Sequence, residues 1–554
     1  MKFCPVLSFV LGIGLLFGGV VQADYDLVIF NGKIVDGTGN AWFLGDLAIQ
    51  GDTIVRITPA GQLKEAAARR TVDASGLVVA PGFIDIQGHS RDELLEGDGR
   101  LVGKITQGVT TEILGEGESN APSRRFDGPH GFDAWLKAMK KHGGSVNFGS
   151  FVGSQTVRSY VKGMKPGKPT ARELESMKRL VRDAMKDGAF GLASALIYPP
   201  DSFVSTEDLI ALSEVMAPLG GLYITHLRSE ADQLLEAIDE AIRIGRESHV
   251  PVEIYHLKAA GQRNWPKAGL AIEKIAQARS KGLDIGANMY PYTAAGTGLT
   301  ACLPPLASAD GKLLENLANP TTRASIIEEV LRPTLPFENL GELATPEGIL
   351  ILGLEKSPMK KYAGQRLSEI ARAEGKSWVE TAISLILAER KRVDTIYFLM
   401  SEENLRLQLR QPWIKFGTDA SGHDPEKPDR LVHPRSYGTF PRILGKYVRD
   451  EGVLTLEDAI RKMTSAVAIR LSIPDRGLVR EGFKADLVLF NPLLIGDRAT
   501  YNSPHQNSVG IHEVYVNGMA VVLEGKPTGA LPGRIVRGPG HRESATPTPM
   551  EDKD

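Results

Sequence analysis

The sequence predicts an α/β fold that consists of a (β/α)8 TIM-like barrel, a small β-sandwich domain built from both termini, and a subdomain inserted into the barrel. Three observations support this prediction. Short strands bounded by turn residues occur near both ends of the chain. Between them, strands alternate with amphipathic helices. That alternation is interrupted once, between Tyr290 and Ile414, by a long segment with helical patterns of its own.

The first 23 residues are typical of a secretory signal peptide. Lys2 provides a positive charge, residues 5–21 form an almost continuous apolar run, and Val21 and Ala23 precede a cleavage site at Asp24. A run of about 17 residues is short for a membrane-spanning helix, which disfavours an uncleaved anchor. We therefore expect a periplasmic or secreted protein, with no membrane attachment once the signal peptide is removed.

Strand patterns at both ends of the remaining chain predict the β-sandwich. Residues 24–80 contain an apolar strand followed by the turn Asn31-Gly32, which is a strong hairpin signal. Strands of the same kind return in residues 471–540. Because the two groups flank one long α/β region, the simplest arrangement places both in one small domain. The polar, proline-containing tail at 541–554 is predicted to be disordered.

Short apolar segments predict the barrel strands. They span residues 82–86, 110–114, 147–152, 190–195, 222–226, 252–256, 283–290 and 414–418. We assign residues 81–470 to the barrel and about 296–392 to the inserted subdomain. In such a barrel the chemistry lies at the C-terminal ends of the strands.

Composition excludes several classes of protein. The chain has 65 Lys and Arg against 67 Asp and Glu, so its formal net charge is −2. A chain without an excess of positive charge is a poor nucleic-acid binder. Its two cysteines are Cys4 and Cys302, and the first lies in the predicted signal peptide. The mature chain can therefore form neither a disulfide framework nor a cysteine-based zinc cluster, and Cys302 is expected to be buried.

Polar residues follow several of the predicted strands and would open onto one barrel mouth. His226 and His256 end two successive strands, Asp419 follows the last strand, and His89 lies three residues beyond the first. Imidazole and carboxylate groups are good ligands for a divalent metal, above all zinc. Each residue alone could be structural, and Asp419 could cap a helix. Together they favour a metal site, with Asp419 placed to move a proton between water and a leaving nitrogen.

Short motifs carry a resemblance to a known family. They are VAPGFID at 79–85, GVTT at 108–111, GLAS at 191–194, IYPP at 197–200, ITHLR at 224–228, YHLKAAG at 255–261, YPY at 290–292, GTD at 417–419, HPR at 433–435, GTFPR at 438–442 and RGLVREG at 476–482. In this combination the chain resembles the metal-dependent amidohydrolase superfamily, and within it the N-acyl-D-amino-acid deacylases (D-aminoacylases). The resemblance extends over residues 26–537.

The resemblance implies roles for individual residues. His226 and His256 match ligands of a tightly held zinc ion, and Asp419 matches the catalytic acid and base. Lys258, Tyr290 and Arg435 match positions that would hold the substrate carboxylate or polarise its carbonyl group. A salt bridge is the alternative role for Lys258 and Arg435, and core packing is the alternative for Tyr290.

The chain departs from the family pattern at two places. The usual first-strand pair His-X-His reads Gln87-Gly88-His89 here, so a second metal position that uses His89 is expected to be weak or absent. A zinc-binding cysteine expected near Gly117 is missing. Glu116 can replace it as the third ligand, and Glu118 is the competing candidate.

The leading hypothesis is therefore zinc-dependent hydrolysis of a linear amide, the deacylation of N-acyl-D-amino acids, with one tightly bound Zn²⁺ and a small-molecule substrate. The segment 190–196 contains no lysine, which counts against the lysine-bridged dinuclear centre of hydantoinases. Two alternatives stay open: another amidohydrolase that acts on a dipeptide or a cyclic amide or imide, and a non-catalytic binding protein on a degenerate barrel.

Overall fold

The computed structural model describes residues 1, 24–334, 337–356, 358–428 and 430–542. The predicted signal peptide beyond Met1 and the predicted tail beyond residue 542 lie outside this part of the chain. Among the described helices, none is long and apolar enough to cross a lipid bilayer.

Parallel strands form the predicted barrel. They are β6 (Phe83–Asp85), β7 (Val109–Leu114), β8 with its continuation β9 (Asn147–Ser150 and Val152–Gly153), β10 (Gly191–Ala195), β11 (Leu222–His226), β12 (Val252–Ile254), β13 (Ile285–Met289) and β17 (Ile414–Phe416). β6, β7 and β8 pair in one sheet, and β9 to β13 pair with β17 in a second. The split strand β8/β9 joins the sheets on one side, and a parallel bridge between Gly88 and Ala420 joins them on the other. The chain thus closes a barrel, which confirms the predicted fold class.

Helices cover the outside of this barrel. They are α1 (Arg91–Leu95), α2 (Val102–Ile105), α3 (Gly131–His142), α4 (Ser154–Lys162), α5 (Ala171–Lys186), α6 (Thr206–Glu214), α7 (Leu234–Ser248), α8 (Lys267–Ser280), α14 (Glu402–Leu409), α15 (Arg435–Arg442), α16 (Leu456–Met463) and α17 (Ser465–Arg470). In α5, a capping box between Thr170 and Glu173 satisfies the first backbone N–H groups. The strands are buried on both faces, which explains why they read as continuous apolar runs.

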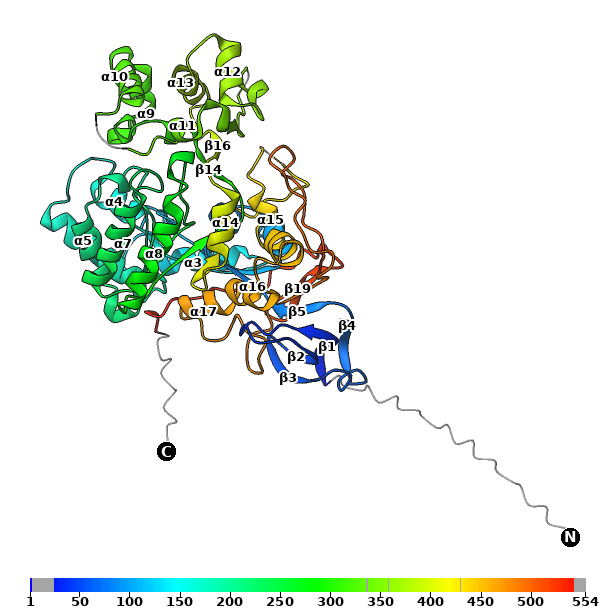
Figure 1. Ribbon diagram of the computed structural model, residues 1–554. Coiled ribbons are helices and arrows are strands. Elements are labelled where there is room, and N and C mark those ends of the chain that lie inside the picture. The colour runs from blue at the N-terminus through cyan, green and yellow to red at the C-terminus, as the bar shows by residue number, and fades with distance from the viewer. Residues whose placement is uncertain (2–23, 335–336, 357, 429, 543–554) are drawn as a thin grey trace, which may run out of the picture.

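Strands from both ends of the chain form the small domain, at the lower right of Figure 1. They are β1 (Tyr25–Ile34), β2 (Phe43–Gln50), β3 (Thr53–Pro59), β4 (Ala68–Asp73), β5 (Val78–Pro81), β18 (Leu487–Phe490), β19 (Ile511–Val516), β20 (Met519–Leu523) and β21 (Lys526–Pro527). They belong to one hydrogen-bonded sheet, in which β5 pairs with β18 and β4 pairs with β1. The strands of the predicted sandwich are therefore connected in one continuous sheet and not in two separate sheets. Leu47, Val79 and Leu487 belong to its common core.

The chain beyond β21 returns to the barrel. Ile535 forms a parallel bridge with Phe148 of β8, and the Gly533 N–H donates to the Gly144 carbonyl oxygen at 2.8 Å. The sequence predicts that this stretch, up to residue 540, belongs to the small domain, but these backbone partners belong to the barrel.

The inserted subdomain lies above the barrel, at the end opposite the small domain (Figure 1). Its strands β14 (Ala294–Gly298), β15 (Ile349–Ile351) and β16 (Asp394–Phe398) pair in the order β14-β16-β15. Its helices are α9 (Leu313–Ala318), α10 (Pro320–Leu331), α11 (Leu340–Ala344), α12 (Leu367–Glu374) and α13 (Trp378–Glu389). Its apolar core, which also includes Tyr290 and Tyr292 at the barrel mouth, buries Cys302 with a free thiol, as predicted. The paired strands extend slightly beyond the predicted limits of 296–392.

Candidate active site

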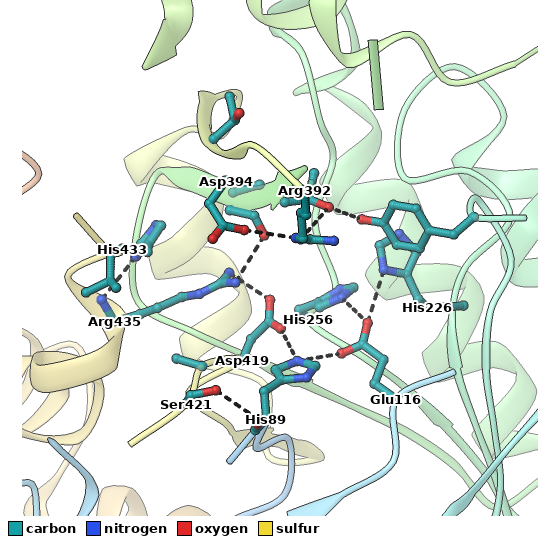
Figure 2. A pocket seen from close by; sticks show the side chains of 18 of the residues that line it. His89, Glu116, His226, His256, Arg392, Asp394, Asp419, Ser421, His433 and Arg435 are labelled. Carbon is teal, nitrogen blue, oxygen red and sulfur yellow. Dashed lines mark hydrogen bonds and ion pairs between the residues drawn. The ribbon is translucent and has the colours of Figure 1, made fainter. Parts of the chain in front are cut away.

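The ends of the barrel strands bring five predicted residues into one cavity. His226 ends β11, and His256, Asp419, His89 and Glu116 lie in the loops that follow β12, β17, β6 and β7. The cavity has a volume of about 760 Å³, and the inserted subdomain contributes part of its wall (Figure 2). The structure therefore brings these side chains together at the barrel mouth, as the sequence predicts.

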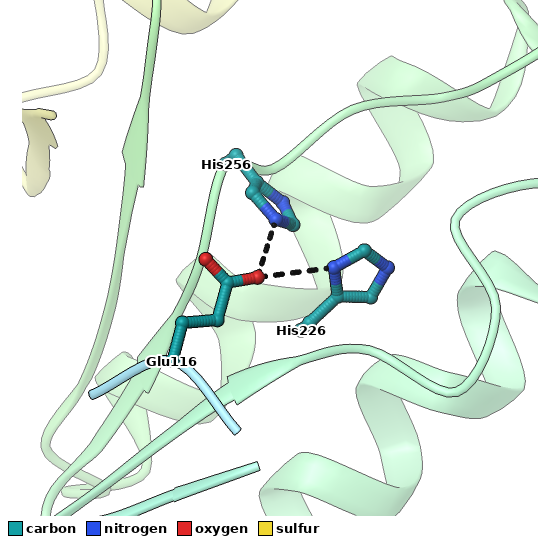
Figure 3. Close-up of side chains that lie close together, drawn as sticks. All are labelled: Glu116, His226 and His256. Atoms are coloured by element: carbon teal, nitrogen blue, oxygen red, sulfur yellow. Dashed lines mark hydrogen bonds and ion pairs between the residues drawn. The ribbon is translucent and has the colours of Figure 1, made fainter. Parts of the chain in front are cut away.

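The Glu116 carboxylate lies between two histidines. Its Oε1 atom is 3.3 Å from His226 Nδ1 and 3.1 Å from His256 Nε2 (Figure 3). All three side chains are nearly buried. Glu118 instead lies outside this group, where its half-exposed carboxylate is 3.2 Å from Arg91 Nη2. Of the two glutamates, the structure brings Glu116 to the histidines.

The same carboxylate also contacts a second group of residues. Glu116 Oε2 is 3.3 Å from His89 Nε2, which in turn is 2.8 Å from Asp419 Oδ1. The Gln87 amide donates to Glu116 Oε2 at 2.5 Å. Glu116 thus offers one oxygen to each of two adjacent clusters, one with His226 and His256 and one with His89 and Asp419.

Electrostatics keep the two central carboxyl groups ionised. Burial raises the pKa of Glu116, but the charge of His256 and hydrogen bonds from the surrounding histidines outweigh it and hold the pKa well below its usual value. Burial likewise raises the pKa of Asp419, but the charge of Arg435, the hydrogen bond from His89 and the charge of His256 together outweigh it, so that this pKa is also lowered. Both groups are therefore carboxylates at neutral pH.

Lys258 is held by a glutamate that the sequence analysis did not single out. Its Nζ atom lies 2.6 Å from Glu230 Oε1, and the same oxygen is 2.9 Å from His256 Nδ1. The charges of Lys258 and Glu230 are thus paired inside the protein. The sequence signal that could have pointed to Glu230 is its spacing, because it comes four residues after His226.

Arg435 and Tyr290 also line the cavity. Arg435 Nη1 is 2.7 Å from Asp419 Oδ2, and its Nη2 donates to the Gly296 carbonyl oxygen of β14 at 3.1 Å. Its buried Nε has no hydrogen-bond partner among the described residues. The guanidinium stacks over the Tyr290 ring at 4.8 Å, and burial raises the pKa of this tyrosine well above its usual value.

His433 supports Arg435, a role that the motif HPR at 433–435 does not by itself indicate. Its Nδ1 accepts from the Arg435 backbone N–H at 3.0 Å, and its Nε2 donates to the Ala294 carbonyl oxygen at 3.0 Å. Burial lowers its pKa well below the usual value, so the ring is neutral.

Beneath the site, a buried lysine joins the first and last barrel strands. Lys104 Nζ contacts Asp85 Oδ2 at 2.6 Å, Thr418 Oγ1 at 2.6 Å and the Ala420 carbonyl oxygen at 2.7 Å, and it lies 3.2 Å from Glu112 Oε1. This network holds both residues that flank Asp419. Asp419 itself has φ +51, a left-handed conformation that the surrounding contacts must maintain.

The donor set of Glu116, His226 and His256 fits a divalent transition metal. Two imidazole nitrogens and one carboxylate oxygen are a ligand set that catalytic zinc accepts with a coordination position left open. His256 has a carboxylate, Glu230, against its other ring nitrogen, as ligating histidines commonly do.

Comparisons with known proteins identify the chain as similar to amidohydrolases. A family model described as "Amidohydrolase family" matches residues 369–522. The chain is 34% identical over 527 residues to a D-aminoacylase of Alcaligenes xylosoxydans xylosoxydans, which covers 92% of this chain and 97% of the relative. A D-aminoacylase structure described as having a binuclear metal centre, with "one-metal activation and second-metal attenuation", superimposes with a TM-score of 0.77 at 32% identity over 93% of this chain and 100% of that one. A structure of N-acyl-D-glutamate deacylase from Bordetella bronchiseptica, in complex with zinc and a phosphonate inhibitor, gives a TM-score of 0.76 at 28% identity with the same coverage.

Proposed function

The chain belongs to the D-aminoacylase family of amidohydrolases, and we propose that it is a zinc-dependent deacylase that hydrolyses N-acyl-D-amino acids to a carboxylate and a free D-amino acid. The observation that carries this proposal is the meeting of Glu116, His226 and His256 at the strand ends, with Asp419 beside them.

We propose that one zinc ion is held tightly by Glu116, His226 and His256. A divalent metal supplies Lewis-acid chemistry at such a site, because it makes water more acidic and polarises a carbonyl group. A second metal ion should bind weakly or not at all, because the Gln87 amide donates a hydrogen bond to the Glu116 oxygen that faces His89 and Asp419.

Asp419 is the proton carrier of the proposed reaction. Its lowered pKa keeps the carboxylate free to accept a proton from the attacking water on Oδ1 or Oδ2. Once protonated, the same group returns the proton to the leaving amino nitrogen. His89 and Arg435 contact one oxygen each and fix the carboxylate in the cavity.

Arg435 is the main recognition group for the substrate carboxylate. Its side chain lines the cavity, and a guanidinium presents its N–H donors in a planar fork that matches a carboxylate in geometry. Tyr290 forms the floor beneath it. Lys258 is less available to bind the substrate carboxylate than its charge suggests, because Glu230 already neutralises it. Its contact with His256 Nδ1 assigns Lys258 to the positioning of that metal ligand.

Metal content and turnover test this proposal together. The zinc-loaded protein should contain about one zinc per chain by elemental mass spectrometry and should hydrolyse an N-acetyl-D-amino acid but not its L-enantiomer. Glu116→Ala should lose both metal and activity, whereas the matched control Glu118→Ala should keep both. Stoichiometric zinc in the Glu116→Ala protein, or no hydrolysis of any N-acyl amino acid by the wild type, would contradict it.

Export of the mature chain is part of the same proposal. It rests on the charged start, apolar run and small residues of the first 23 positions. Mass spectrometry of the protein recovered outside the cytoplasm should give a chain that begins at Asp24.

A further inference from the structure

A second arginine faces the cavity from the inserted subdomain. Arg392 precedes β16, and its Nε is 2.9 Å from Asp394 Oδ1 while its Nη2 is 3.4 Å from Thr297 Oγ1. Its side chain lines the cavity (Figure 2). The same side chain is 63% accessible to solvent. The guanidinium is therefore oriented by protein contacts and still open to a ligand.

The charges around Arg392 leave one positive charge in excess. Asp394 is shared, because its other oxygen lies 3.4 Å from Arg430 Nε. Two guanidinium groups thus face one carboxylate. The neighbouring Lys391 does not add to this excess, since its ammonium is paired with Glu355 at 2.8 Å.

Arg392 and Arg435 contact neighbouring residues of one strand. Arg435 Nη2 donates to Gly296, and Arg392 Nη2 contacts Thr297, both in β14. Gly298 comes two residues after Gly296 and lies against the Arg392 guanidinium. A Cβ atom added to Gly298 would be 3.6 Å from Arg392 Cζ. Two residues of extended strand span about 7 Å, so both guanidinium groups are within reach of one small molecule.

We propose that Arg392 forms a subsite for a second carboxylate of the substrate, so that the preferred substrates are N-acyl amino acids with two carboxylates. This inference rests on the proposed function, in which Arg435 takes the carboxylate next to the scissile amide. The second carboxylate belongs to the amino-acid side chain or to the acyl group, and both sources share the chemistry that a guanidinium recognises.

Isosteric substrate pairs test the subsite. N-acetyl-D-glutamate and N-acetyl-D-glutamine differ in side-chain charge at nearly the same shape, and N-succinyl-D-alanine and N-succinamoyl-D-alanine test the acyl side in the same way. The wild type should prefer the charged member of at least one pair, and Arg392→Met should reduce that preference in kcat/KM by about 10- to 100-fold, the range of a hydrogen bond to a charged group. Hydrolysis of the neutral member should change less than about threefold. The pair that responds identifies the source of the carboxylate.

Two further variants separate the subsite from general electrostatics. Lys391→Met removes a neighbouring positive charge that is already paired, and it should leave the preference unchanged. Arg392→Lys keeps the charge without the planar fork and should give an intermediate preference. An equal loss in Arg392→Met and Lys391→Met would overturn the subsite.

The outcomes also separate this inference from the proposed function. Hydrolysis of the neutral substrates without preference for a carboxylate would overturn the subsite and leave the deacylase proposal intact. If no substrate is hydrolysed, the deacylase proposal fails, and calorimetric binding of N-acetyl-D-glutamate and N-acetyl-D-glutamine to the same protein then decides. Equal affinities, or a difference that persists in Arg392→Met, would overturn the subsite.

Discussion

Lys104→Met is the most informative test of how the barrel supports its site. The Lys104 side chain is fully buried and lies between the equally buried Asp85 and Glu112. Removal of one partner from a buried ion pair costs about 3–5 kcal/mol, because the remaining charges stay desolvated without compensation. Methionine fills a similar volume, so the loss reports the charge and its hydrogen bonds rather than a cavity.

The expected loss converts to a measurable shift in melting temperature. An unfolding entropy of about 2.1 cal/mol/K per residue corresponds to about 1.1 kcal/mol/K for a chain of this length that unfolds as one unit, so Tm should fall by about 3–4 °C. Burial already raises the pKa of Glu112, and Lys104 opposes that rise. Without Lys104 this carboxyl should bind a proton more readily in the folded state, and the loss should therefore be larger at pH 8 than at pH 5.5.

The chain offers a matched control for this variant. Lys462 is also fully buried, but its ammonium donates to the Leu409 carbonyl oxygen at 2.6 Å and faces Asp458, which is partly exposed. Lys462→Met should therefore cost much less than Lys104→Met in calorimetry of both zinc-loaded proteins. The reasoning is refuted if the two variants lose the same Tm, or if the Lys104→Met deficit does not grow between pH 5.5 and pH 8.

Three further predictions concern single carboxylates. Asp419→Asn should lower kcat by about 10²–10⁴-fold with zinc content unchanged; near wild-type turnover would remove Asp419 from the proton transfer. Glu230→Gln should weaken zinc affinity by about 10- to 100-fold in a chelator competition, because the carboxylate against His256 Nδ1 is lost; unchanged affinity would make the Glu230–Lys258 pair purely structural. Burial raises the pKa of Asp201 to about 7, so its contribution to stability falls as pH rises from about 4 to 7, and Asp201→Asn should raise Tm at pH 8 but not at pH 4.5; equal shifts at both pH values would contradict the buried ionisation.

The sequence predicted the parts of the site that follow from strand ends. His226 and His256 end apolar strands, and parallel strands of a barrel bring such positions to one mouth. The sequence could not separate Glu116 from Glu118, because both lie in a loop where Gly115 and Gly117 adopt positive φ and the alternation of side chains along a strand no longer applies.

Interactions between distant loops were beyond prediction. Lysine is rarely buried, so nothing in the local sequence indicated that Lys104 of α2 would be fully buried against the barrel strands. Its position depends on Asp85 and Glu112, which belong to two different strands. The pairing of Glu230 with Lys258 likewise depends on how two loops fold against each other.

The junction between β5 and β18 has a consequence for biosynthesis. Pro81 of β5 pairs with Leu487 of β18, so about 400 residues must be made between the two partners. At about 5–20 residues per second, the edge of β5 stays unpaired for roughly 20–80 s on the ribosome. A nascent chain that stops before Leu487 leaves an apolar edge that can pair with other chains. The small domain therefore closes only once synthesis has passed β18, and shorter nascent chains keep the edge of β5 unpaired.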